Sequence, residues 1–203
     1  MRSFPLIRAA QAMAVVAIAA FALAPSFIAG EAEPSAMVGQ PIGDISLPDY
    51  SGKQVSLADF KDSKGVAIIF VSTKCPVSNA YNERMTALAA EFQKKGIQFL
   101  GINSNKAELP EEMSKHAADN KWNFPVLKDS GNKVADKLKA SVTPEVFLVD
   151  AKGVLRYHGR IDDSQDPAGI KSQDLRNAMD ALISGGEVSK KEAKAFGCSI
   201  KRA

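Results

Sequence analysis

The two cysteines are the residues of this sequence best suited to chemistry. Cys75 stands between an apolar run and a long helical pattern, and Pro76 is a favourable first residue for that helix. A thiol at a helix start faces the positive end of the helix dipole, and Lys74 adds a positive charge, so the thiolate should be favoured. A thiolate is the nucleophile that attacks a peroxide or a disulfide. The alternative interpretation is a buried, inert cysteine.

No second thiol is close to Cys75 in the sequence. Ser78 stands where a Cys-x-x-Cys pair would have its second cysteine, so the only candidate partner within the chain is Cys198, in a polar tail. About 14 residues separate Cys198 from the predicted closing helix, and an extended chain of that length spans at most about 45 Å. The tail can therefore reach Cys75. A resolving thiol, a structural disulfide and an unpaired cysteine all remain open for Cys198.

Two further residues are candidates near the reactive thiol. Ser72, three residues before Cys75, could offer its hydroxyl to the thiolate or to a bound peroxide oxygen, or it could be a polar residue at a strand end. Pro144 follows Thr143 just before a predicted strand, and X-Pro bonds are cis in only about 5–6% of cases.

Composition and residue counts exclude several kinds of site. The chain has 203 residues and a net charge of +3, with no dense basic run, so we expect no nucleic-acid partner. Two cysteines cannot supply a four-cysteine zinc set, and neither His116 nor His158 has a second ligand close by in the sequence. We therefore expect no metal and no other cofactor.

The apolar pattern predicts a layered α/β domain. Continuous or alternating apolar runs predict strands, and spacings of three and four predict helices. The expected order is β-α-β-α followed by β-β-α, which places a terminal hairpin beside parallel strands. The predicted strands cover 66–71, 97–102, 146–149 and 154–157, with an extended piece at 124–127; the predicted helices cover 76–95, about 109–120, 134–138 and 170–184.

The first 30 residues resemble a secretory signal peptide. Arg2 and Arg8 precede an apolar stretch, residues 9–23, which is shorter than the roughly 20 residues of a membrane-spanning helix. An uncleaved anchor is the alternative, but we expect cleavage, no stable membrane anchor, and a periplasmic or otherwise extracytoplasmic protein. Losing both arginines leaves 24 basic and 23 acidic residues, a net charge of +1. An extracytoplasmic compartment would permit disulfides to form.

Three segments together resemble a known superfamily. The active-site strand and helix of the thioredoxin-like redoxins, the AhpC/TSA superfamily, resemble the segment FVSTKCPVSNAY. Their N-terminal hairpin resembles the segment VGQPIGDISLPDYSGKQVSLADFK. Their cis-proline strand and final hairpin resemble the segment TPEVFLVDAKGVLRYHGRIDD. The resemblance covers roughly residues 37–184. Within the superfamily it is closest to peroxiredoxin-like redoxins with a CPVSNAY site, INSN after the second strand, and GRIDD after the last.

This resemblance implies a thioredoxin fold, with a central mixed sheet flanked by helices and an N-terminal hairpin extension. It implies that Cys75 is the nucleophilic residue and that Pro144 is a cis-proline beside it. Peroxiredoxin-type sites also use an arginine near the thiolate, and Arg160 of GRIDD is the candidate; a solvated basic face is the alternative. We expect a redoxin domain at 37–188 and a cysteine-bearing tail at 189–203.

Two departures from the family patterns leave the substrate open. Ile68 stands where peroxiredoxins have a proline, and Lys74 and Ser78 replace the Trp and second Cys of the dithiol reductases. The leading hypothesis is reduction of a peroxide by Cys75, with Cys198 or an external thiol reductant resolving the sulfenic acid. The alternatives are a thiol–disulfide oxidoreductase acting on exported protein disulfides, and a non-enzymatic copper-handling relative using both cysteines and a histidine.

Overall fold

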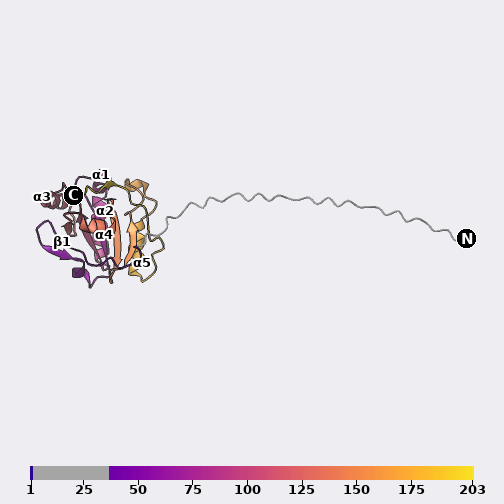
Figure 1. Ribbon diagram of the computed structural model, residues 1–203. Helices are drawn as coiled ribbons and strands as arrows, with labels where there is room; N and C mark the ends of the chain where they lie inside the picture. Colours follow the sequence, from indigo (N-terminus) through magenta and orange to yellow (C-terminus); the bar gives the residue numbers. More distant parts are fainter. Residues whose placement is uncertain (2–36) are drawn as a thin grey trace. The chain divides into compact units, whose positions relative to one another are not determined.

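A five-stranded mixed sheet forms the centre of the protein. The computed structural model describes Met1 and residues 37–203, so the predicted leader lies outside the described residues apart from Met1. The sheet order is β5-β4-β3-β7-β8, in which β3, β4 and β5 run parallel and β7 and β8 are antiparallel neighbours (Figure 1). The strands are β3 (Gly65–Phe70), β4 (Ile97–Asn103), β5 (Val126–Lys128), β7 (Glu145–Asp150) and β8 (Leu155–Gly159). The predicted mixed sheet is confirmed.

Strand β3 is buried on both faces, as its continuous apolar run predicts. Its side chains alternate, so Ala67 and Ile69 face one hydrophobic cluster, whereas Ile68 and Phe70 face another. Residues of the strand from Val66 to Phe70 are at most 3% exposed. The sheet therefore separates two apolar layers, and the end of its central strand is held rigidly.

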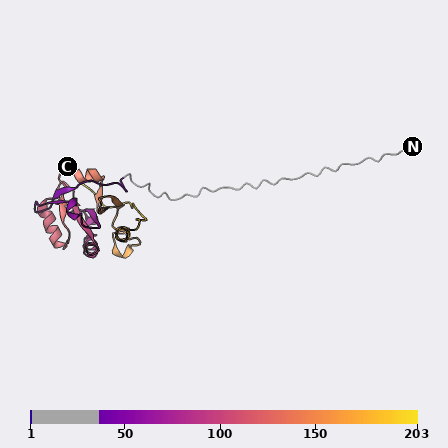
Figure 2. The ribbon, with the colours of Figure 1, turned by 90° about the horizontal axis from the view of Figure 1, so that it is seen from below.

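Helices cover both faces of this sheet. The helices α2 and α5 lie on one side and α4 on the other (Figure 2). The helices are α1 (Pro76–Asn79), α2 (Asn82–Gln93), α3 (Pro110–Asp119), α4 (Lys133–Leu138) and α5 (Asp174–Ile183). None of the helices described here has the length and apolar content that crossing a membrane requires.

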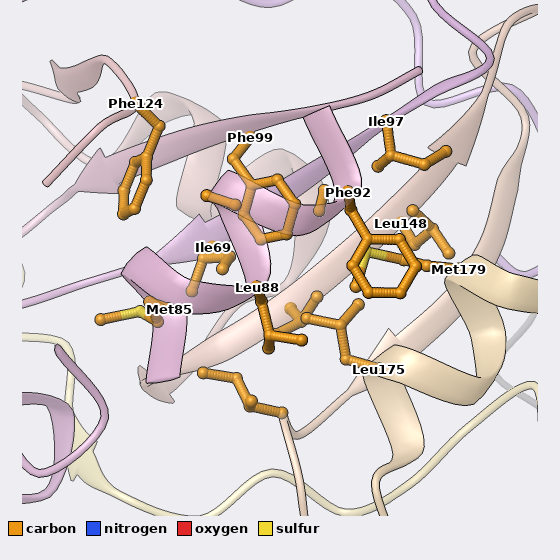
Figure 3. Packing of buried hydrophobic residues seen from close by; sticks show 14 of the residues in the cluster. Ile69, Met85, Leu88, Phe92, Ile97, Phe99, Phe124, Leu148, Leu175 and Met179 are labelled. Carbon is orange, nitrogen blue, oxygen red and sulfur yellow. The ribbon is translucent and has the colours of Figure 1, made fainter. Parts of the chain in front are cut away.

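The larger apolar layer holds α2 and α5 against the sheet. Phe92 of α2 lies beside Met179 of α5, and both are fully buried together with Leu148 of β7 (Figure 3). Burial of each such side chain contributes about 1.5–3 kcal/mol. This packing fixes α2, and through it the short α1 segment that follows Cys75.

The N-terminal hairpin implied by the resemblance is present. Strand β1 (Ser46–Pro48) pairs antiparallel with β2 (Gln54–Ser56), and a 3₁₀ turn, η1 (Leu57–Phe60), follows. Ser56 caps this turn by accepting the Ala58 N–H. The hairpin packs beside the second apolar layer, away from α2 and α5.

Two predicted helices have different boundaries. The helix predicted over 76–95 is broken between α1 and α2, because the Tyr81 N–H bonds to Ser78 O three residues back and tightens the turn. The closing helix begins at Asp174 instead of Ile170. Its expected first turn is diverted because Asp163 accepts the N–H groups of the preceding residues, Lys171 and Ser172.

The tail after α5 packs against the domain, and we name residues 187–203 the C-terminal strap. Its strand β9 (Cys198–Ser199) pairs antiparallel with β6 (Val142–Thr143), which directly precedes Pro144. Further anchors lie on both sides of this pair: the Ala193 N–H donates to His158 O at 3.1 Å, and the Lys106 N–H donates to Lys201 O at 2.8 Å. The strap is therefore fastened on either side of Cys198.

Candidate active site

Cys75 caps the first helical turn after β3. Its backbone is extended (φ −85°, ψ 114°), and its Sγ accepts the Ser78 N–H at 3.3 Å. Pro76 occupies the first helical position, where its missing N–H leaves no donor unpaired. The Cys75 side chain is only 3% exposed. The sequence placed this thiol at a helix start, and the structure has it there.

The Thr143–Pro144 peptide bond lies against the thiol, and it is cis, as the resemblance implied. In its thiol form Cys75 donates to Thr143 O at 3.3 Å. The loop after α4 and the segment after β3 therefore meet at the sulfur, although 68 residues separate them in the chain.

Cys198 faces Cys75 from the strap. In the β6–β9 pair, Cys198 lies opposite Thr143, whose carbonyl oxygen contacts the Cys75 sulfur. The two thiols are near enough for each to shift the pKa of the other. Both cysteines are free in this structure.

The surroundings of the two thiols make their acidities unequal. Burial by itself raises the pKa of Cys75, but hydrogen bonds from the Cys198 thiol, the Ser78 amide and the Thr143 side chain outweigh it, so the pKa lies below its ordinary value. The pKa of Cys198 is raised, first by its contact with Cys75 and then by burial. Cys75 is therefore the more acidic thiol of the pair.

Gly197 permits the approach of the strap, and sequence reasoning missed this residue. A Cβ atom at Gly197 would lie 2.0 Å from Thr143 O and 2.7 Å from Thr143 C. These are backbone atoms, which cannot rotate away. In the sequence, Gly197 directly precedes Cys198, and a glycine there could have suggested that two backbones approach closely at this point.

The Ser72 hydroxyl, one of the groups expected near the thiol, is hydrogen-bonded to a buried carboxylate. It donates to Glu108 Oε1 at 2.5 Å, so its single proton is not directed at Cys75 Sγ. The Ser72 oxygen instead accepts the N–H groups of Lys74 and Cys75, at 3.2 and 3.0 Å. Ser72 thus shapes the loop that carries the cysteine.

Glu108 is a second residue that sequence reasoning missed. It is 3% exposed, and its carboxylate accepts hydrogen bonds from the Ser72 hydroxyl, from the amide and hydroxyl of Thr73, and from the Asn103 side chain. Burial raises its pKa, but these hydrogen bonds outweigh burial, so the pKa is lowered. The carboxylate therefore stays charged and holds the segment before Cys75. In the sequence it is one carboxylate in a polar run, with nothing to distinguish it.

The Glu108→Gln protein is expected to be less stable by about 1–3 kcal/mol at pH 7, because an amide cannot accept all four donors. A lowered folded-state pKa stabilises the fold above the unfolded pKa, roughly 4.3, and this stabilisation is lost as the pH falls through the folded value. Urea unfolding at pH 7 and in acid should show the difference from the parent shrinking in acid. Glu111→Gln, at an exposed carboxylate in the first turn of the same helix α3, is the control. A constant difference at both pH values would contradict the role of the charge.

Arg160, the arginine that GRIDD led us to expect near the thiolate, binds a carboxylate at the start of α5. Its Nε donates to Asp174 Oδ2 at 2.6 Å, and Lys190 of the strap donates to the other oxygen of Asp174 at 2.9 Å. The Cys75 sulfur has no hydrogen bond from an arginine within the part of the chain that the structure describes. Asp174, at the start of α5, attracts the guanidinium because it is a buried carboxylate.

Both histidines are engaged outside the pair of thiols. His158 Nε2 lies 2.7 Å from Glu145 Oε1, and the other Glu145 oxygen accepts the Ser141 and Val142 N–H groups beside β6. His116 Nε2 lies 3.2 Å from the Asn82 side-chain amide. Within residues 37–203, no three His, Cys, Asp or Glu side chains gather as metal ligands would.

Comparison with known proteins places this site in a family. The sequence matches the AhpC/TSA family over residues 38–158. It is 25% identical to thiol-disulfide oxidoreductase ResA of Halalkalibacterium halodurans over 124 residues, which are 61% of this chain and 69% of ResA. It is 30% identical to peroxiredoxin Bcp of Escherichia coli K12 over 131 residues, which are 57% of this chain and 82% of Bcp.

A solved structure resembles almost the whole domain. A hypothetical protein from Sinorhizobium meliloti 1021 superposes with a TM-score of 0.78 at 33% identity, covering 84% of this chain and 97% of that one. A putative thiol:disulfide interchange protein DsbE from Chlorobium tepidum shares the fold with a TM-score of 0.61 at 22% identity, covering 72% of this chain and 97% of that one. The chain therefore belongs to the AhpC/TSA family and is an oxidoreductase with a thioredoxin fold.

Proposed function

We propose that this protein is a two-cysteine thiol peroxidase in which Cys75 reacts with the peroxide and Cys198 resolves the product. The observation that supports this most is the contact between a buried thiol of lowered pKa and a second thiol from the strap. A sulfur that is 3% exposed suits a small oxidant better than a protein-sized one.

The chemistry has two steps in the protein. The Cys75 thiolate attacks a peroxide oxygen, breaks the O–O bond and becomes a sulfenic acid, while the released hydroxide takes a proton and leaves as water. Cys198 then attacks the Cys75 sulfur, which breaks the S–O bond and releases a second water as the disulfide forms. Its contact with Cys75 gives Cys198 a high effective concentration for this step. An external thiol reductant returns both cysteines to thiols.

Thiol–disulfide exchange on exported proteins is the second candidate. The hydroxyl of Ser72 donates to Glu108 and the guanidinium of Arg160 donates to Asp174, so neither of these two expected groups is directed at a peroxide bound beside Cys75. The relatives also include a protein named as a thiol-disulfide oxidoreductase. Either reaction would leave the same Cys75–Cys198 disulfide.

Single-turnover oxidation of the reduced full chain distinguishes the two candidates. Hydrogen peroxide and oxidised glutathione are each mixed with the protein, and the Cys75–Cys198 disulfide is followed by intact mass and peptide mapping. We expect peroxide to form it much faster than the disulfide reagent does. A faster reaction with oxidised glutathione would favour thiol–disulfide exchange, and failure of both oxidants to join the two cysteines would contradict both candidates.

We also infer that the protein acts outside the cytoplasm. The support is the sequence of the first 30 residues: two arginines, a short apolar stretch, and small residues after it. Fractionation of a bacterial host expressing the full chain, with mass analysis of the new N-terminus, tests this. A full-length protein that stays in the cytoplasm would contradict export.

A further inference from the structure

The main chain of His158 contacts the strap before Cys198. His158 lies in the edge strand β8, where its N–H donates to Lys191 O at 3.0 Å and its carbonyl oxygen accepts the Ala193 N–H at 3.1 Å. Between these two residues, Glu192 Oε1 lies 3.8 Å from His158 Nδ1. That oxygen is buried and makes no hydrogen bond within residues 37–203, so the imidazole is its polar neighbour. The first part of the strap is therefore docked on His158.

The side chain of His158 contacts a different segment, the loop that carries the cis-proline. Its ring stacks on Phe147, its cross-strand neighbour in β7, with the ring centroids 4.4 Å apart. Its Nε2 lies 2.7 Å from Oε1 of Glu145, the residue that directly follows Pro144. The stacking on Phe147 fixes the plane of the imidazole, so that Nε2 is held towards the carboxylate.

Glu145 extends this contact to the strap after Cys198. Its Oε2 accepts the Ser141 and Val142 N–H groups, at 2.7 and 3.0 Å. Ser141 O in turn accepts the Ile200 N–H at 2.9 Å, and Val142 lies opposite Ser199 in the β6–β9 pair. The loop that Glu145 holds is thus the loop on which the second part of the strap pairs.

The Glu145 carboxylate depends on His158 for one of its two oxygens. Glu145 is 4% exposed, and within residues 37–203 no lysine or arginine forms an ion pair with it. Burial raises its pKa, but hydrogen bonds from His158, Ser141 and Val142 outweigh burial, so the pKa is lowered. Without the donor at His158, Oε1 would be a buried charge with no partner, which is costly. The carboxylate would then have to turn towards water and release the two amides.

We propose that His158 and Glu145 are a positioning pair that holds the strap on both sides of Cys198 and so brings its sulfur to Cys75. This inference rests on the proposed function, in which Cys198 attacks the Cys75 sulfenic acid, the S–O bond breaks and water leaves as the disulfide forms. The contacts of the Cys75 sulfur come from Ser78, Thr143 and Cys198. The pair therefore acts through position, by raising the effective concentration of Cys198 at the reacting sulfur.

His158→Asn and His158→Gln test the pair. A Gln amide extends about as far as the imidazole Nε2 and can still donate to Glu145, whereas an Asn amide is one methylene shorter and does not reach it. Both are neutral amides at a side chain that is 25% exposed, so both variants should fold. Thermal unfolding of each full-chain variant checks this.

The measurement separates the resolving step from the first reaction of Cys75. Each reduced protein receives hydrogen peroxide in the presence of dimedone, and the Cys75 sulfenic acid partitions between the dimedone adduct and the disulfide with Cys198. The same substitutions in a Cys198→Ser background give the dimedone rate alone, which normalises the ratio. We expect the ratio of adduct to disulfide to rise by about 10- to 100-fold in His158→Asn, and to stay close to that of the parent in His158→Gln.

Two further variants complete the test. Arg156→Asn is the matched control, because Arg156 is partly exposed, lies two residues away on the same face of β8, and should leave the ratio unchanged. Glu145→Ala removes the contact from its other end and should raise the ratio as His158→Asn does. Adding His158→Asn to Glu145→Ala should then have little further effect, because both break one chain of contacts. Should the buried Glu145→Ala site fail to fold, the two His158 variants still decide the question.

Three results would overturn the proposal: a parent-like ratio in His158→Asn, an equal rise in His158→Asn and His158→Gln, or additive effects of His158→Asn and Glu145→Ala. Failure of the parent protein to form either the Cys75 sulfenic acid or the disulfide with Cys198 would contradict the proposed function instead. The two failures are therefore distinguishable.

Discussion

Cys75→Ser is expected to abolish oxidation of the protein by peroxide and by small disulfides, whereas Cys198→Ser is expected to keep the first chemical step. A serine hydroxyl does not ionise near neutral pH, so the Ser78 N–H and the helix start would have no thiolate to stabilise. In Cys198→Ser, peroxide should convert Cys75 to a sulfenic acid that persists. Dimedone labelling followed by peptide mass analysis reads this directly: no label in Cys75→Ser, and one label on Cys75 in Cys198→Ser.

Ser199→Ala is the matched control for these variants. Ser199 neighbours Cys198 in β9 but is exposed, so its loss should leave both thiols and the rate of disulfide formation unchanged. Thermal unfolding of each variant checks that the fold is intact. If Cys75→Ser still consumed peroxide at the parent rate, Cys75 would not be the reacting group, and the proposed function would fail.

The pH dependence of Cys75 follows from the same contacts. Since its pKa is lowered, its alkylation rate should rise with a midpoint below the ordinary cysteine value, roughly 8.5. In Cys198→Ala the side-chain hydrogen bond from Cys198 that lowers this pKa is lost, so the midpoint should move upward. Iodoacetamide labelling from pH 5 to 9 measures both midpoints.

The part of the site that could be predicted from sequence is the part made by neighbouring residues. An apolar run followed by Cys75 and Pro76 is enough to predict a buried strand, a turn and a helix start, because each of these depends on local patterning. The resemblance added the cis bond before Pro144, which local propensity could not give. The mixed sheet also followed from the order of the elements.

The parts that could not be predicted depend on contacts between distant segments. Ser72 and Glu108 are 36 residues apart, and nothing in either segment shows that a carboxylate takes the serine's proton. Arg160 belongs to the GRIDD motif that suggested an arginine near the thiolate, yet its guanidinium donates to Asp174. The length of the tail showed that Cys198 could reach Cys75, but it could not predict that Cys198 pairs with Thr143 in the β6–β9 register. Each of these contacts joins segments that are distant in the sequence and come together only in the folded chain.

Gly197→Ala is expected to separate the two thiols while leaving the domain folded. The new methyl group would lie 2.0 Å from Thr143 O, so β9 must move away from β6 and carry Cys198 with it. Strain from one added methyl group in a packed site costs about 1–3 kcal/mol, and each 1.4 kcal/mol is about tenfold. Disulfide formation after peroxide should therefore be slower by roughly five- to 150-fold, and the Cys75 sulfenic acid should accumulate and take up dimedone.

Gly186→Ala is the matched control, because a Cβ there meets its nearest atoms at 3.5 and 3.6 Å, which is ordinary contact. The anchors on either side of Cys198, at Ala193 and Lys201, remain in both variants, so a loss confined to Gly197→Ala isolates the β6–β9 pair. Parent-like disulfide formation in Gly197→Ala would mean that the strap reaches Cys75 without this register. A slow disulfide with normal sulfenic acid formation would separate the two steps, and it would show that Cys198 acts through its position as well as its chemistry.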